Sequence, residues 1–375
     1  MIKSFHYDID ERFLNYFDKR IKQVFFYITN NCQLRCKQCL YKPDLTFGMG
    51  KNEIDKNVIF ELGEDFYNMG AKKVTIMGGE PAMYGDKNHE DLIDIISGLK
   101  KIGYEYIRMD SNGIYEDDML SLPGIKQIDE ISFSLDGHTQ EINDWVRGTG
   151  AYNKCVHNIK RALSLGYKVD VTACIHKKLS EKDQNGVYQI INMINWAENI
   201  GIKEINFHVL FKHGFPMDTW TEDTAIMPEE WTAIKTELYR LVYDNNGKLK
   251  IHVRIPEHFV NKKEFENNPK FYGYCPAKLG ERILVHPDGQ LRICSGLISS
   301  KYCVAKYLDD KRILWEEGKT NELFDHNCSE YTPCTNQSKN MKCPDELVPL
   351  CFSFKPLQKE FVWDKKLNWD ERKRN

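Results

Sequence analysis

The feature that most constrains this chain is a regular alternation of strand-like and helix-like segments between residues 23 and 211. Apolar, β-prone runs predict strands at 23–29, 73–77, 106–110, 130–135, 168–175 and 204–211. Apolar residues at helical spacing predict helices over 51–69, 91–102, 152–165 and 186–199. Strands joined through helices pair in parallel by right-handed crossovers. The pattern therefore predicts a parallel α/β barrel, complete or partial, made of six strand–helix units.

Length and composition suggest a second unit beyond this barrel. The chain has 375 residues, which is long for one compact core, and 41% of them are hydrophobic. After a helix predicted over 228–243 the pattern changes to short strands, turns and cysteines. We expect an N-terminal extension over 1–22, the barrel over 23–227, a linking helix over 228–247 and a cysteine-rich domain over 248–375.

Charge and hydropathy exclude several classes of function. The net charge is -3, so no global electrostatic attraction to nucleic acid or to a membrane surface is expected. No run of eighteen apolar residues is present, which predicts no membrane span. The N-terminus lacks the apolar block of a signal peptide, and we expect a cytoplasmic protein. In a reducing cytosol, clustered cysteines more often bind metals than form disulfides.

The first cysteine cluster directly follows the first predicted strand. Cys32, Cys36 and Cys39 have the spacing C-x3-C-x2-C. Three thiolates leave one iron of a cubane cluster without a protein ligand, and that iron can bind a substrate or cofactor. A closed zinc site with a histidine as fourth ligand is the alternative, although no histidine lies within the loop.

Polar and glycine motifs follow the next predicted strands. They are Gly78-Gly79-Glu80-Pro81 after the second, Ser111-Asn112-Gly113 after the third and Ser134-Leu135-Asp136-Gly137 at the end of the fourth, with Arg147 a short distance later. Each motif alone is an ordinary turn signal. Because the carboxyl ends of parallel strands share one edge of the sheet, we expect the motifs to meet the cysteine loop there.

Together the cysteine loop and these motifs resemble the radical S-adenosylmethionine (SAM) enzymes, over about residues 20–215. The resemblance implies a partial (β/α)6 TIM-like barrel and a [4Fe-4S] cluster held by the three cysteines. The amino and carboxylate groups of SAM would bind the open iron. Reductive cleavage of SAM would then give a 5′-deoxyadenosyl radical that abstracts hydrogen from a substrate.

The resemblance also implies roles in SAM binding for individual residues. Gly78 and Gly79 would let the backbone approach the methionine amino group, and Glu80 would accept hydrogen bonds from it. Ser111 and Asn112 suit a ribose or a carboxylate.

Three further residues complete this predicted SAM site. Ser134 and Asp136 suit the ribose hydroxyls, and Arg147 suits the methionine carboxylate. Gln38 stands where many relatives have an aromatic residue before the third cysteine, so the contact with adenine there would rest on backbone groups.

The C-terminal cysteines resemble the auxiliary-cluster extensions of this family, called SPASM and twitch. Cys275, Gly289 and Cys294 have the spacing C-x13-G-x4-C, and residues 283–293 read as a hairpin that would bring both cysteines to one cluster. The resemblance implies one auxiliary [4Fe-4S] cluster and leaves a second open. The other candidate ligands are Cys328, Cys334, Cys343, Cys351 and Asp325. Zinc in place of a cluster is the alternative.

Two cysteines outside these patterns, Cys174 and Cys303, are read as buried apolar residues, with donation of a hydrogen atom to a substrate radical as the alternative. Residues 207–223 follow the last barrel strand, where they would either contact substrate or pack as a linker.

The predicted function is that of a radical SAM enzyme acting on a peptide or protein, by cross-linking, oxidation or epimerisation. A small-molecule dehydrogenase or epimerase acting on an aminocyclitol or sugar is the first alternative. A non-catalytic iron–sulfur or zinc scaffold is the second. An electron donor such as a flavodoxin or ferredoxin is the expected partner.

Overall fold

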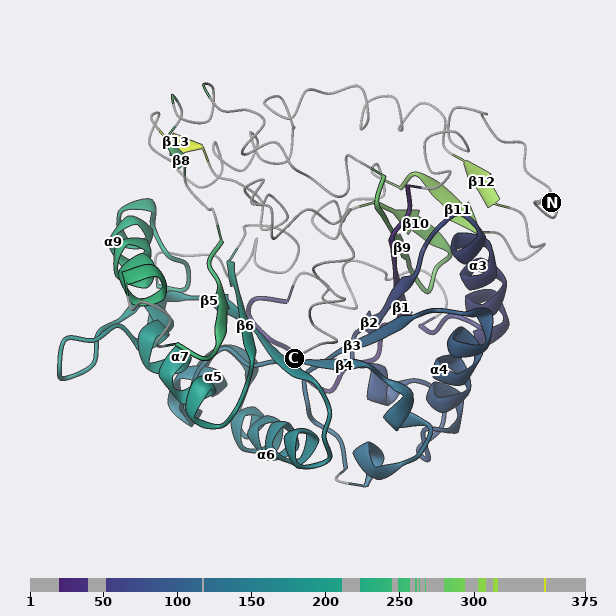
Figure 1. The fold of residues 1–375 in the computed structure, drawn as a ribbon, viewed down its shortest axis with the longest axis horizontal. Helices are drawn as coiled ribbons and strands as arrows, with labels where there is room; N and C mark the ends of the chain where they lie inside the picture. The colour runs from purple at the N-terminus through teal and green to yellow at the C-terminus, as the bar shows by residue number, and fades with distance from the viewer. Residues whose placement is uncertain are drawn as a thin grey trace.

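A single mixed sheet organises the chain in the computed structural model (Figure 1). The structure describes residues 20–39, 52–116, 118–210, 223–244, 249–256, 260–261, 263, 267, 280–293, 303–307, 313–315 and 347–348. The sheet has eleven strands in the order β12-β11-β10-β9-β1-β2-β3-β4-β5-β6-β7. A separate two-stranded sheet pairs β13 (Leu347–Val348) with β8 (Val260–Asn261).

The predicted strands are all present. They are β1 (Gln23–Thr29), β2 (Lys73–Gly78), β3 (Tyr106–Ser111), β4 (Glu130–Ser134), β5 (Val169–Ile175) and β6 (Glu204–Val209). Each pairs in parallel with the next. This confirms the predicted parallel α/β fold.

Strands from later in the chain extend the sheet at both edges. β7 (His252–Arg254) pairs in parallel with β6, and β9 (Arg282–Val285) pairs in parallel with β1. From β9 the sheet continues antiparallel through β10 (Gln290–Arg292), β11 (Ala305–Tyr307) and β12 (Ile313–Trp315). Because β7 and β12 stand at opposite ends of the order, the sheet formed by the described residues does not close on itself. The barrel is therefore partial.

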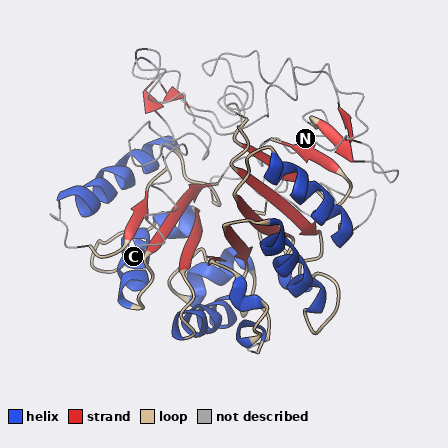
Figure 2. Cartoon of the chain, turned by 45° about the vertical axis from the view of Figure 1, so that its right-hand side comes forward, coloured by secondary structure: helices blue, strands red, loops and turns tan. Residues whose placement is uncertain are grey.

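Helices cover the outer face of this sheet (Figures 1 and 2). They are α3 (Lys56–Asn68), α4 (Glu90–Ile102), α5 (Gln140–Arg147), α6 (Ala151–Ser164), α7 (Gln189–Asn199) and α9 (Pro228–Tyr239). Local signals fix their ends: Asp55 caps α3 by accepting from the Asn57 amide at 2.8 Å, and Gly103 ends α4 at φ 117°. None of the helices in this part of the chain has the length and apolar character needed to cross a membrane.

The hydrophobic core lies between the sheet and these helices. Outward-facing strand residues such as Ile76, Ile107, Phe133 and Val171 are completely buried there. Burying this apolar surface is the main stabilising contribution to the fold.

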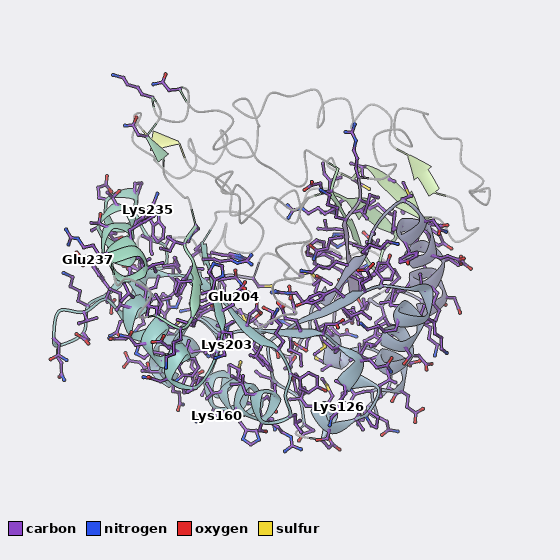
Figure 3. All side chains as sticks on the ribbon, viewed as in Figure 1. Lys126, Lys160, Lys203, Glu204, Lys235 and Glu237 are labelled. Carbon is purple, nitrogen blue, oxygen red and sulfur yellow. The ribbon has the colours of Figure 1, made fainter. Side chains whose placement is uncertain are left out.

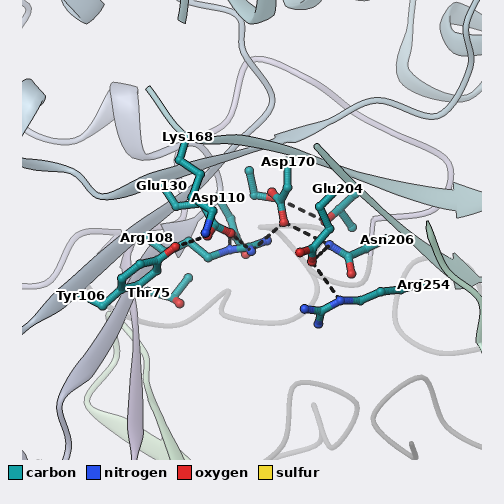
Figure 4. A network of polar contacts seen from close by, with 12 residues as sticks. Thr75, Tyr106, Arg108, Asp110, Glu130, Lys168, Asp170, Glu204, Asn206 and Arg254 are labelled. Carbon is teal, nitrogen blue, oxygen red and sulfur yellow. Dashed lines mark hydrogen bonds and ion pairs between the residues drawn. The ribbon is translucent and has the colours of Figure 1, made fainter. Parts of the chain in front are cut away.

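The inner face of the sheet is polar, unlike the inner face of most parallel sheets. Charged surface residues such as Lys126, Lys160 and Lys235 lie on the outside of the molecule, whereas Glu204 lies near its middle (Figure 3). Inward-facing residues of β3 to β7 form one connected network (Figure 4). Its members are Tyr106, Arg108, Asp110, Glu130, Lys168, Asp170, Glu204, Asn206 and Arg254.

Arg108 is the central cation of this inner-face network. Its Nη1 lies 2.6 Å from Glu130 Oε1 and 2.8 Å from Asp170 Oδ2, and its Nε lies 2.6 Å from Asp110 Oδ1. Burial raises the pKa of Asp170, and the positive charge of Arg108 acts against that rise. Arg108 therefore holds together carboxylates from three neighbouring strands.

We expect Arg108→Leu to lower the free energy of unfolding by about 3–5 kcal/mol, because it leaves buried carboxylates without their cation. Urea denaturation at neutral pH measures this change. Arg240→Leu removes an arginine whose side chain is 63% exposed and serves as the control, with little expected effect. Equal stability of the two variants would contradict the role assigned to Arg108.

Candidate functional site

Glu53 anchors the entrance to the cysteine loop. Its Oε1 accepts from the Thr29 hydroxyl at 3.2 Å and from the Asn31 side-chain amide at 2.9 Å. The Asn30 amide also donates to the Asn52 carbonyl at 2.7 Å. The segment that leads from β1 to Cys32 is therefore fixed on one side by residues 52–53.

Gly78 and Gly79 fix this segment from the other side. The Gly79 amide donates to the Thr29 carbonyl at 2.7 Å, and the Glu80 amide donates to the Asn31 carbonyl at 2.8 Å. A Cβ atom on Gly79 would lie 2.2 Å from the Asn31 oxygen, so only glycine allows this approach. The amides of Gly79 and Glu80 thus hold the end of β2 against the cysteine loop. The contact of Gly78 and Gly79 with SAM stays a prediction.

The three cysteines lie on one loop beside the end of α5. Cys36 is buried, whereas Cys32 and Cys39 are partly exposed, and none of the described cysteines forms a disulfide. The Lys37 amide donates to the Val146 carbonyl at 2.9 Å, and the Cys36 thiol lies 3.9 Å from the Arg147 carbonyl oxygen. Burial raises the pKa of Cys36 to about 12, so without a metal this thiol stays protonated at neutral pH.

This arrangement fits a cluster better than a single ion. Within the described ranges, no three His, Cys, Asp or Glu side chains are placed to share one metal ion. In a cubane each thiolate binds a different iron, so its ligands need not converge on one point. A bound metal also favours the thiolate form that burial alone disfavours. The donor set of three thiols on one loop therefore suits a [4Fe-4S] cluster with one open iron.

Glu80 lies at the centre of the site and is fully buried. Its Oε1 accepts from the Ser111 hydroxyl at 2.8 Å and from the Ala82 amide at 3.2 Å, while Oε2 accepts from the Asn112 amide at 2.7 Å. Burial raises the pKa of Glu80 to about 7, and these hydrogen bonds oppose the rise. The carboxylate joins the ends of β2 and β3.

Asp136 and Arg147 form a buried ion pair, with 2.6 Å between Arg147 Nε and Asp136 Oδ2. The same Oδ2 accepts from the side-chain amide of Gln38, and Oδ1 accepts from the backbone amide of Cys174 at 2.6 Å. Asp136 therefore connects the cysteine loop, α5 and the end of β5. The structure brings Gln38, Asp136 and Arg147 together, as the strand-end argument predicted.

Of the remaining predicted residues, Ser134 and Cys174 lie near this site and Cys303 lies away from it. Ser134 ends β4, and its carbonyl lies 3.8 Å from the thiol sulfur of Cys155. Cys174 is on β5 beside this site, whereas Cys303 is buried just before β11, three strands away from β1. Burial raises the pKa of both thiols. Their predicted part in hydrogen transfer stays a prediction.

Several predictions concern residues outside the described ranges. These are the auxiliary-cluster ligands Cys275, Cys294, Cys328, Cys334, Cys343, Cys351 and Asp325, together with residues 211–222 of the segment after β6. The predicted hairpin between Cys275 and Cys294 does form, as β9 and β10.

The sequence argument missed supporting residues of the site. Asn143 accepts the backbone amide of Asp136 at 2.9 Å, and His176 Nε2 lies 2.8 Å from the Asp136 carbonyl oxygen. Asn143 belongs to α5, which was not predicted as a helix. Thr139, whose side chain caps α5 by accepting from the Ile142 amide, was the available sequence signal.

Comparison with known proteins gives the same family as the motifs. The profile of the Radical SAM superfamily matches residues 26–185. A probable GTP 3′,8-cyclase of Saccharolobus islandicus is 23% identical over 279 residues, which cover 74% of this chain and 84% of that protein. The corresponding protein of Archaeoglobus fulgidus is 24% identical over 273 residues, covering 71% and 83%.

Two solved structures share the fold. Streptococcus suis SuiB bound to its precursor peptide SuiA has a TM-score of 0.56 at 14% identity, with 77% of this chain and 63% of SuiB covered. The structure of native anSMEcpe with bound AdoMet, which is SAM, has a TM-score of 0.58 at 15% identity, with 86% of this chain and 88% of that chain covered. At these identities the likeness concerns the fold. The family profile shows that residues 26–185 are similar to the Radical SAM superfamily, in agreement with the motifs at the strand ends.

Proposed function

We propose that Cys32, Cys36 and Cys39 hold a [4Fe-4S] cluster and that SAM binds between this cluster and the carboxyl ends of β2 to β5. When bound, this pair supplies a 5′-deoxyadenosyl radical that abstracts hydrogen from a substrate. The observation that carries the proposal is the convergence of the cysteine loop, Glu80 and the Asp136–Arg147 pair at one edge of the sheet.

Arg147 and Asp136 would position the two ends of SAM. The ion pair uses Arg147 Nε. We assign the Nη groups to the methionine carboxylate, because a guanidinium presents donors on two edges. Ser134 and Asp136 would face the ribose, and the Gln38 amide keeps Asp136 oriented.

Glu80 would face the methionine ammonium. Until a cation is bound, its buried charge is poorly compensated, and this is the physical reason for its raised pKa. The structure thus supports a site prepared for a positively charged group.

A peptide or protein is the substrate we propose first. The fold is shared with SuiB, whose structure holds a precursor peptide, although this chain spans 63% of SuiB. The C-terminal cysteines, with Cys275 and Cys294 as first ligands, would hold one auxiliary [4Fe-4S] cluster in a domain that begins near residue 248. The resemblance leaves open whether the domain holds a second auxiliary cluster. A flavodoxin or ferredoxin would supply the electron.

A small polar molecule is the second candidate, and the inner face of the sheet favours it. Strand register aligns Ser134, Thr172, Asn206 and Arg254 in one row across β4 to β7. This row leads away from the proposed SAM site and offers hydroxyl, amide and guanidinium groups. The probable GTP 3′,8-cyclases, which are similar to most of this chain, are named for a small polar molecule, GTP.

Replacing Cys32, Cys36 and Cys39 together by Ala should abolish the formation of 5′-deoxyadenosine from SAM and dithionite, because the cluster then has no ligands. Iron content should fall by about four atoms per chain. Cys155→Ala removes a buried thiol outside the loop, and this variant should keep both the cleavage of SAM and the iron content of the wild-type protein. Persistence of SAM cleavage in the triple variant would refute the proposed function.

Glu80 should make the stability of the ligand-free protein depend on pH. Its folded pKa of about 7 exceeds the usual 4.5, so between these values the folded protein keeps a proton that the unfolded chain has released. The free energy of unfolding should therefore fall as pH rises through this window, by up to about 3 kcal/mol, and stay level above it.

Chemical denaturation from pH 4 to 8 measures this dependence, and Glu80→Gln should have a smaller slope. The slope that remains comes from other buried carboxyls with raised pKa, such as Asp65 and Asp170. Glu141→Gln, at a side chain that is 81% exposed, serves as the control and should follow the wild-type curve. Identical slopes for wild type and Glu80→Gln would show that Glu80 is not the responsible group.

Deuterium transfer separates the two substrate classes. If GTP deuterated on its ribose is incubated with the reconstituted enzyme, a peptide-modifying enzyme should give unlabelled 5′-deoxyadenosine. Appearance of deuterium in that product would establish the small-molecule candidate in its place. A short precursor-peptide reading frame beside the gene would be independent support for the first.

A further inference from the structure

We propose that Asn112 adjusts the reduction potential of the cluster by donating a hydrogen bond to the sulfur of Cys32. Asn112 Nδ2 lies 3.6 Å from Cys32 Sγ. This inference rests on the proposed function, because it requires Cys32 to be a cluster ligand.

The backbone of Ile114 fixes which way the Asn112 amide points. The Ile114 amide donates to Asn112 Oδ1 at 2.8 Å, so the oxygen must face Ile114 and the NH2 group must face the cysteine. The Ile114 carbonyl accepts from Gln33 Nε2 at 2.6 Å, which fixes Gln33 in the same way.

Gln33 and Asn112 then form a reciprocal pair of amides. Asn112 Nδ2 donates to Gln33 Oε1 at 3.3 Å, and Gln33 Nε2 lies 3.3 Å from Asn112 Oδ1. One hydrogen of the Asn112 NH2 group is used by Gln33, and the other is directed to Cys32.

These contacts use the full hydrogen-bonding capacity of the Asn112 side chain, which has two donor hydrogens and two acceptor positions. Only 7% of Asn112 is exposed, and its backbone amide is held by Glu80 at 2.7 Å. A hydrogen bond from this side chain to SAM would require breaking one of them. The structure therefore assigns Asn112 to the cysteine rather than to the ribose or carboxylate predicted from the sequence.

A donor at this position should favour the reduced cluster. Cys32 Sγ accepts from the Asn112 side-chain amide, and an N–H donor directed at a thiolate sulfur stabilises negative charge on that sulfur. One-electron reduction from dithionite or a redox mediator makes the cluster more negative. Hydrogen bonds to cluster sulfurs therefore raise the reduction potential.

The experiment is a potentiometric titration of the anaerobically reconstituted full-length protein, followed by electron paramagnetic resonance. The signal that changes on addition of SAM identifies the cluster of Cys32, Cys36 and Cys39. Asn112→Leu removes both donor hydrogens. Asn112→Asp also removes both donor hydrogens but keeps an acceptor for the Ile114 amide, so it preserves the hydrogen bond that Asn112→Leu would break.

Asn158→Leu is the matched control. Asn158 Nδ2 donates to the Gly113 carbonyl at 2.9 Å and to the Tyr115 carbonyl at 3.1 Å, so it supports the same loop without touching the sulfur. Both Asn112 variants should shift the midpoint to more negative potential, Asn112→Asp further because it adds negative charge. The Asn158→Leu variant should have the same midpoint potential as the wild-type protein.

Two results would overturn the inference. One is a wild-type midpoint in Asn112→Leu with full iron content. The other is loss of iron from both Asn112 variants but not from Asn158→Leu, which would show that Asn112 only holds the loop. If the wild-type protein has no cluster that responds to SAM, the proposed function fails, and this result is distinct from the other two.

Discussion

The site depends on a backbone contact between the end of β2 and the start of the cysteine loop. Two hydrogen bonds, from Gly79 to Thr29 and from Glu80 to Asn31, bring these segments together where a Cβ on Gly79 would collide with the Asn31 oxygen. The contact places the Glu80 side chain beneath the loop, where it binds the end of β3. The cysteines therefore take their position from the sheet, and a loop alone would not fix them.

Two buried carboxylates extend this arrangement across the sheet in different ways. Glu80 accepts only from uncharged donors, Ser111, Asn112 and Ala82, so burial dominates and its pKa rises to about 7. Asp136 has the Arg147 guanidinium beside it at 2.6 Å. Asp136 is thus compensated by a cation within the protein, whereas Glu80 has only uncharged hydrogen-bond donors among the described residues. In the proposed function this asymmetry would give SAM a defined direction, with its ammonium toward β2 and its carboxylate toward α5.

The sequence was sufficient to predict the parallel fold and the strand-end cluster of motifs, because strand and helix periodicity and C-x3-C-x2-C are local signals. The sequence was insufficient to predict which groups each side chain of the site contacts. The sequence predicts a contact with SAM for Asn112 because its donors suit a ribose, and this stays a prediction. That they face Cys32 depends on Ile114 and Gln33, which only the folded backbone brings near. The edge strands β7 and β9 were likewise not expected in this sheet, since their pairing spans long sequence separations.

The polar inner face explains how one sheet can serve both stability and function. A closed barrel of this size fills its interior with apolar side chains. Here the sheet of the described residues stays open, and Arg108 with its carboxylates occupies that face. Such a network offers little cohesion from the hydrophobic effect, so stability comes mainly from the outer, helix-covered face. The inner face therefore keeps polar groups where a closed barrel has apolar packing, although its carboxylates depend on Arg108 for compensation of their charge.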